Sequence, residues 1–88
     1  MDAARFFVSG RVQGVGFRAS ARYRALELGL AGYVRNLADG RVEAFVQGDA
    51  KDIETFARWL EAGPPLARVD DVQRVVAKVE QRIGFGYG

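Results

Sequence analysis

The order of two hydrophobic periodicities along the chain constrains its fold more than any other feature. Apolar residues recur at helical spacing from Phe17 to Leu28, and again between a cap at Asp49 and a stop at Gly63-Pro64-Pro65. Strand-like runs, rich in β-branched and aromatic residues, cover residues 5–12, 31–37, 41–47, 69–79 and 83–87. The sequence therefore predicts the order strand, helix, strand, strand, helix, strand, with a short fifth strand at the end.

This order matches a split β-α-β unit that occurs twice in succession. A chain of 88 residues is long enough for one domain, so we expect a single domain over residues 1–88. Both helices must bury their apolar faces against the same sheet. The predicted fold class is α+β, a ferredoxin-like sandwich (βαββαβ plus a short fifth strand) with two helices packed on one face of an antiparallel sheet. Because many functions occur on this fold, the fold alone does not indicate one.

Cysteine and histidine are both absent from the chain. Their absence excludes disulfides, a thiolate nucleophile, every Ser-His triad and every metal site built on these ligands. An enzyme with this sequence must work with arginine, asparagine, carboxylates, backbone amides and water. The formal net charge of +2 is too small to indicate a nucleic-acid-binding protein by itself. We therefore expect no metal, no cofactor and no nucleic-acid partner.

The N-terminal residues 1–5 do not have the layout of a signal peptide. No apolar stretch approaches the roughly 20 residues that a membrane-spanning helix needs. We therefore expect a cytoplasmic protein that does not associate with a membrane, and we expect it to be a monomer.

The segment from Gly10 to Arg18 is the first candidate for a functional site, and it joins the first strand to the first helix. Its glycines allow successive backbone N–H groups to turn inward and bind an anion, and the helix start adds further free N–H groups. Arg18 stands at that helix start, where its planar guanidinium can hold two phosphate oxygens. The alternative is a glycine-rich turn that only reverses the chain.

Two better-known phosphate motifs do not fit this segment. Gly14-x-Gly16-x-x-Ala19 satisfies a relaxed dinucleotide fingerprint, but the chain is too short for a doubly wound domain and a hairpin follows. The P-loop motif requires Gly-Lys followed by Ser or Thr, which the chain lacks. A pair of acidic residues, Asp70-Asp71, is expected to form a solvated bulge in the fourth strand and not a metal site.

Asn36 is the second candidate, at the end of the second strand and just before the hairpin signal Asp39-Gly40. An asparagine here can be a turn residue that bonds its own backbone. It can also be a side chain that orients water or an oxyanion. The spacing leaves both interpretations open.

Two motifs together resemble the acylphosphatase family. The run Val8-Ser9-Gly10-Arg11-Val12-Gln13-Gly14-Val15-Gly16-Phe17-Arg18 resembles its first signature. The second signature is similar to Gly32-Tyr33-Val34-Arg35-Asn36, followed by Asp39-Gly40-x-Val42-Glu43. Gly48 before the second helix and Gly63-Pro64 after it also fit the family's layout, so the resemblance covers nearly the whole chain.

The resemblance implies hydrolysis of the carboxyl-phosphate bond of an acyl phosphate to carboxylate and inorganic phosphate, without a metal. It implies that Arg18 binds the phosphate and that Asn36 positions the water. It also implies that the phosphate lies against the loop backbone, which is formed by Gln13, Gly14, Val15, Gly16, Phe17 and Arg18.

Two other functional classes remain open from the residues. One is a non-catalytic ferredoxin-like module that binds a phosphorylated ligand, and the other is a partner-binding domain that uses the strand around Val75-Val76. Asn36 discriminates between enzyme and binder, because a simple phosphate binder does not need an amide that places water.

Overall fold

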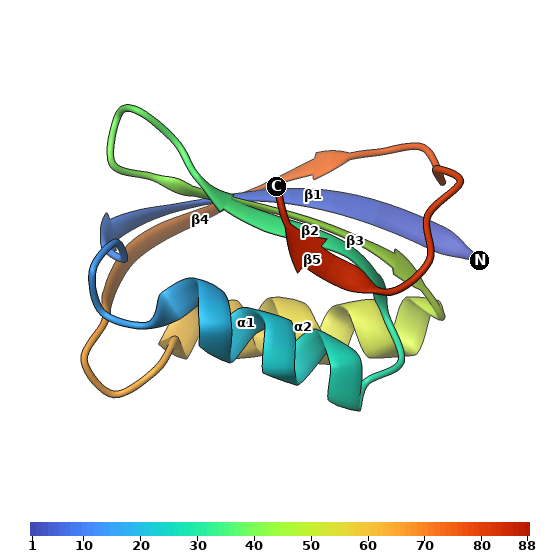
Figure 1. The fold of residues 1–88 in the computed structure, drawn as a ribbon, viewed down its shortest axis with the longest axis horizontal. Coiled ribbons are helices and arrows are strands. Elements are labelled where there is room, and N and C mark those ends of the chain that lie inside the picture. Colours follow the sequence, from blue (N-terminus) through green and yellow to red (C-terminus); the bar gives the residue numbers. More distant parts are fainter.

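Five strands form one sheet, and two helices cover one of its faces (Figure 1). This computed structural model describes residues 1–88. Along the chain the elements are β1 (Asp2–Arg11), α1 (Phe17–Glu27), β2 (Ala31–Asn36), β3 (Val42–Gly48), α2 (Ala50–Ala62), β4 (Arg68–Val76) and β5 (Phe85–Tyr87). The predicted order of elements and the ferredoxin-like sandwich are confirmed. Neither helix is long and apolar enough to cross a membrane.

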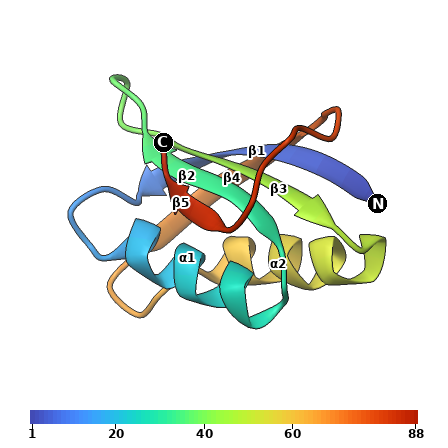
Figure 2. The same cartoon turned by 45° about the vertical axis from the view of Figure 1, so that its right-hand side comes forward.

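The strand order across the sheet is β4-β1-β3-β2-β5. The first four of these strands pair antiparallel, as predicted, whereas β5 pairs parallel with β2 and makes the sheet mixed. The direction of β5 follows from the topology, because β4 ends at the edge of the sheet where β2 begins. The segment 77–84 crosses from β4 to β2 at this edge of the sheet. The strand β5 that follows therefore runs beside β2 in the same direction (Figure 2).

The core lies between the helices and the sheet. Each helix contributes one apolar stripe, with Phe17, Ala21 and Ala25 from α1 and Ile53, Phe56 and Leu60 from α2. The central strand β3 supplies Val42, Ala44 and Val46 to this core, which confirms the predicted alternation. The residues on its opposite face are also buried, namely Glu43, Phe45 and Gln47. Side chains and the segment 77–84 therefore cover part of the sheet face that the helices leave free.

The predicted bulge at the acidic pair is present in β4. Ser9 of β1 pairs with Asp71 and the next residue, Gly10, pairs with Val69, so that Asp70 is left without a partner. Gly10 is required here, because a Cβ at this position would meet the backbone of Arg68. The bulge lies beside the end of β1, where the chain leaves the sheet for the loop that precedes α1.

A glycine in β2 gives a sharp test of the sheet packing. Gly32 has φ +148°, and a Cβ at this position would collide with the carbonyl oxygen of Phe45 on β3. Gly32→Ala should lower the free energy of unfolding by about 2 to 3 kcal/mol, since backbone atoms must move apart. The matched control is Gly86→Ala in the neighbouring strand, where a Cβ meets nothing within 4 Å. Urea denaturation of both variants measures the difference, and equal stabilities would contradict this packing.

Candidate active site

The loop between β1 and α1 presents backbone N–H groups that the protein does not use. No backbone N–H of residues 13–19 donates to a protein acceptor, and the first bond of the helix runs from Ser20 N to Gly16 O over 3.1 Å. A helix start always leaves such donors free unless a side chain caps them. Here the cap residue is Gly16, at φ +78°, and it has no side chain to offer. This end of α1 is therefore open to an anion.

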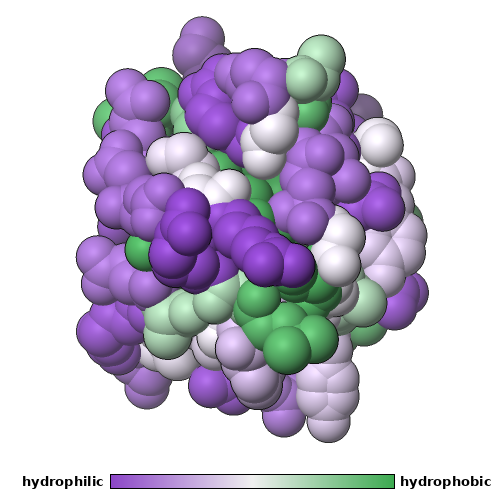
Figure 3. All heavy atoms as spheres, turned by 90° about the vertical axis from the view of Figure 1, so that its left-hand side faces the viewer, coloured by the Kyte–Doolittle hydropathy of each residue, from purple (hydrophilic) through white to green (hydrophobic).

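A hollow of about 360 Å³ lies at this open helix end. It is lined by residues of the loop, of the first turn of α1, and of the ends of β2 and β5: Val12, Gly14, Gly16, Phe17, Arg18, Ala19, Asn36 and Tyr87. Figure 3 views this end of the molecule, where hydrophilic side chains cover most of the surface around a few apolar groups. The hollow thus combines free amides with one cationic and one carboxamide side chain.

The sheet register explains why Arg18 and Asn36 line the same hollow. Val42 of β3 pairs with Val8 of β1 on one side and with Asn36 of β2 on the other. Because β1 and β2 are both antiparallel to β3, they run in the same direction and end at the same edge of the sheet. Asn36 closes β2 there, and the loop that leads to Arg18 leaves β1 there.

The side chains of Arg18 and Asn36 are both free to bind a ligand. Arg18 is exposed and forms no ion pair, in contrast to the paired arginines at positions 5, 24, 35, 41, 68, 74 and 82. The hydrogen bonds near Asn36 belong to its neighbours Arg35 and Asp39, and none involves its own carboxamide. The interpretation of Asn36 as a turn residue bonded to its own backbone is therefore wrong.

Two residues of the predicted phosphate loop use their side chains for other contacts. The amide Nε2 of Gln13 donates to the carbonyl oxygens of Leu37 and Arg41, at 2.8 and 3.0 Å. These bonds tie the loop to the β2–β3 hairpin that carries Asn36. Val15 packs against the core. Neither residue is among those that line the hollow, so the prediction that their backbone N–H groups bind the phosphate stays a prediction.

Two residues that line the hollow lie outside the predicted site, Ala19 and Tyr87, and Tyr87 comes from the far end of the chain. Its ring lies under the guanidinium of Arg18, with 5.5 Å between Cζ and the ring centroid. Its position depends on the parallel pairing of β5 with β2, which places Tyr87 opposite Val34. The only sequence signal was an aromatic residue in a glycine-rich tail.

Comparison with known proteins decides between the functional classes. The acylphosphatase family profile matches residues 4–86. The chain belongs to the acylphosphatase family. An acylphosphatase of Nitrosococcus oceani is 52% identical over 92% of this chain and 91% of its own length. One from Xanthomonas euvesicatoria is 52% identical over the full length of both chains. The crystal structure of acylphosphatase from Bacillus subtilis superposes with a TM-score of 0.96, at 35% identity, over 100% of this chain and 99% of that one.

Membership of the acylphosphatase family supports a hydrolase and not a simple binding module. The structure holds no group of three or more carboxylates or other metal-ligating side chains that could bind a metal ion. Arg18 is the only charged side chain that lines the hollow.

A buried carboxylate holds the end of β2 from the other face of the sheet. Glu43 is only 4% exposed, and its Oε1 accepts a hydrogen bond from Nε of Arg35, the residue before Asn36, at 2.6 Å. Its Oε2 accepts from the Tyr33 hydroxyl at 3.2 Å and lies 2.9 Å from Nε of Arg5. The bond to Glu43 raises the pKa of Arg35 above its usual value.

Glu43→Gln tests this support of the acylphosphatase site. The change keeps the shape but removes the charge between Arg5 and Arg35, and we expect the free energy of unfolding to fall by about 1 to 3 kcal/mol. The matched control is Glu27→Gln, which breaks an exposed pair with Arg24 and should cost less than about 1 kcal/mol. Thermal and urea denaturation provide the measurement. The assignment fails if the two variants are equally stable.

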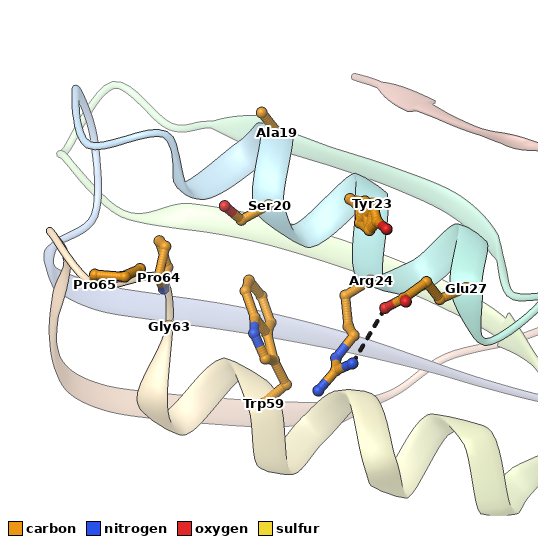
Figure 4. Close-up of a pocket in the computed structure, with 9 residues that line it drawn as sticks. All are labelled: Ala19, Ser20, Tyr23, Arg24, Glu27, Trp59, Gly63, Pro64 and Pro65. Carbon is orange, nitrogen blue, oxygen red and sulfur yellow. Dashed lines mark hydrogen bonds and ion pairs between the residues drawn. The ribbon is translucent and has the colours of Figure 1, made fainter.

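A second and larger hollow of about 530 Å³ lies between α1 and α2 (Figure 4). Tyr23 and Trp59 line it together with Pro64 and Pro65 from the segment after α2. Arg24, which also lines it, is already bonded to Glu27 at 3.1 Å. Since this hollow contains neither a free cation nor Asn36, the smaller hollow at the start of α1 is the candidate active site of this acylphosphatase.

Proposed function

We propose that the enzyme hydrolyses the carboxyl-phosphate bond of acyl phosphates to carboxylate and inorganic phosphate, with the phosphate in the hollow at the start of α1. The observation that carries this proposal is the meeting of three unused groups at one hollow. They are the free backbone N–H groups of Gly14 and of residues 16–19, the unpaired guanidinium of Arg18 and the unbonded carboxamide of Asn36.

The phosphate is held by charge and by geometry. Its oxygens accept from the loop amides, where the positive end of the α1 dipole favours an anion. Arg18 adds a charge-assisted bidentate pair, which is stronger than a bond between neutral groups. These donors keep their positions as charge redistributes during the reaction, which is the main requirement in phosphoryl transfer.

Asn36 orients the attacking water. A carboxamide cannot act as a strong base, so its role is to hold the water in line with phosphorus and opposite the leaving carboxylate. The water oxygen forms a bond to phosphorus, the bond from phosphorus to the acyl oxygen breaks, and its electron pair leaves with the carboxylate. One proton of the water passes to another phosphate oxygen, and the other proton stays on the oxygen that is now bonded to phosphorus. A carboxylate is a good leaving group, so the reaction needs no general acid, and a chain without histidine can perform it.

We assign no metal to this reaction, because none of the side chains that line the hollow is a carboxylate that could hold a cation. The test is hydrolysis of benzoyl phosphate by the purified protein in the presence of a chelator, followed by ultraviolet absorbance. Rapid hydrolysis that resists the chelator supports the proposal. Folded protein that binds inorganic phosphate but does not hydrolyse benzoyl phosphate would instead indicate a non-catalytic phosphate-binding module.

The predictions of a cytoplasmic monomer without a nucleic-acid partner remain predictions. Sedimentation of the purified chain tests the oligomeric state. Cell fractionation tests the location, and a titration with RNA and DNA tests the absence of a nucleic-acid partner.

A further inference from the structure

We infer that Tyr87 is a positioning residue that holds the guanidinium of Arg18 ready for phosphate. This inference rests on the proposed function of Arg18. The Tyr87 ring lines the same hollow as Arg18 and Asn36. The Cζ atom of Arg18 lies over that ring, 5.5 Å from its centroid. No other contact of the Arg18 side chain, to a carboxylate or to any hydrogen-bond acceptor, fixes its guanidinium.

The chemistry of the contact suits a phosphate-binding arginine. A guanidinium attracted to an aromatic ring uses its flat face, whereas its N–H donors lie in its plane and point outward. A carboxylate partner would also order the side chain, but it would neutralise the charge and compete with the phosphate for the same donors. An aromatic ring orders the side chain and leaves both the charge and the donors free.

The fold secures Tyr87 although β5 is short. Phe85 is buried in the core, and its carbonyl oxygen accepts from Nε of Arg22 at 2.9 Å. Backbone bonds join the strand to β2 on both sides of Tyr87, from Gly32 N to Gly84 O at 3.0 Å and from Gly88 N to Val34 O at 3.1 Å. The backbone at Tyr87 is thus fixed by contacts that do not involve the Tyr87 side chain.

Arg22 also lies near the Tyr87 ring. Its Cζ lies 6.0 Å from the Tyr87 centroid, one helical turn after Arg18. Its bond to the carbonyl of Phe85 keeps it on β5, and it does not line the hollow. Arg18 and Arg22 therefore contact the same ring but differ in their other contacts, since Arg22 bonds to β5 and Arg18 lines the hollow.

Tyr87→Leu and Tyr87→Phe test the inference. The leucine variant keeps apolar bulk but removes the π face, and we expect the Kd for inorganic phosphate to rise about three- to fivefold, with kcat/KM falling by at least this factor. Tyr87→Phe keeps the ring and should stay within about twofold of the parent, because the hydroxyl makes no hydrogen bond to the protein. Tyr23→Leu is the matched control, since this exposed tyrosine of α1 lies outside the hollow.

A double-mutant cycle separates positioning from a general structural role. In an Arg18→Ala background, Tyr87→Leu should leave both the phosphate Kd and kcat/KM for benzoyl phosphate unchanged, because the group that it positions is gone. Melting temperatures verify that both leucine variants are folded. The inference is overturned if Tyr87→Leu binds phosphate like the parent, if phenylalanine is as harmful as leucine, or if leucine does equal harm without Arg18. An Arg18→Ala variant that binds phosphate normally would instead overturn the proposed role of Arg18 in binding the phosphate, on which this inference rests.

Discussion

Asn36→Ala should lose most of its turnover and still bind inorganic phosphate almost as well as the parent. In the proposed mechanism the carboxamide places the attacking water but does not hold the phosphate, so its loss should affect only the transition state. We expect kcat to fall by about 10²- to 10³-fold, the range found when one positioned polar group of an active site is removed. Benzoyl phosphate hydrolysis gives kcat, and inhibition by inorganic phosphate gives the affinity.

Gln73→Ala is a suitable control for this experiment. Gln73 is another exposed carboxamide, on β4 and away from the hollow, and its removal should change neither quantity. Equal losses of phosphate affinity and turnover in Asn36→Ala would show that Asn36 helps to hold the phosphate, which contradicts this division of roles.

Arg18→Ala should lose phosphate affinity and rate together. The guanidinium is the only charged side chain of the hollow, and its bidentate pair is formed in both the ground state and the transition state. We expect kcat/KM to fall by about 10²-fold or more, together with a large rise in the inhibition constant for phosphate.

Arg58→Ala removes the same charge from an exposed position on α2 and serves as the control. This control distinguishes the loss of the bidentate contact between Arg18 and phosphate from a general effect of net charge, which acts over the whole surface. Normal phosphate binding by Arg18→Ala would mean that the loop amides alone hold the anion, and the role of Arg18 as a clamp would be wrong.

Local patterns in the sequence were sufficient for much of the fold. They made Arg18 and Asn36 candidates, and the resemblance to the acylphosphatase family supplied their expected roles. The glycines around Gly14 and Gly16, the helix that starts at Phe17, and the hairpin after Asn36 are all encoded over short distances. Arg18 and Asn36 line the same hollow because β1 and β2 flank β3 in the sheet and end at the same edge, which the order of elements along the chain does not show by itself.

The features that the sequence analysis did not predict depend on contacts between segments that are distant along the chain. Tyr87 reaches the hollow only because β5 pairs parallel with β2, and a three-residue strand has too little pattern to reveal its partner. Glu43 alternates along β3 like an exposed residue, yet it is buried by arginines from other strands. Gln13 looked like one more residue of the phosphate loop, whereas its side chain bonds to carbonyl groups more than 20 residues away.

In the proposed mechanism water attacks phosphorus, and not the acyl carbon, in the hollow formed by Arg18, Asn36 and the loop amides. Hydrolysis of benzoyl phosphate in water enriched in oxygen-18, with mass spectrometry of both products, distinguishes the two points of attack. Attack on phosphorus places one labelled oxygen in the inorganic phosphate and none in the benzoate. Label in the benzoate would mean that water attacks the acyl carbon, and the roles proposed for Arg18 and Asn36 would both be wrong.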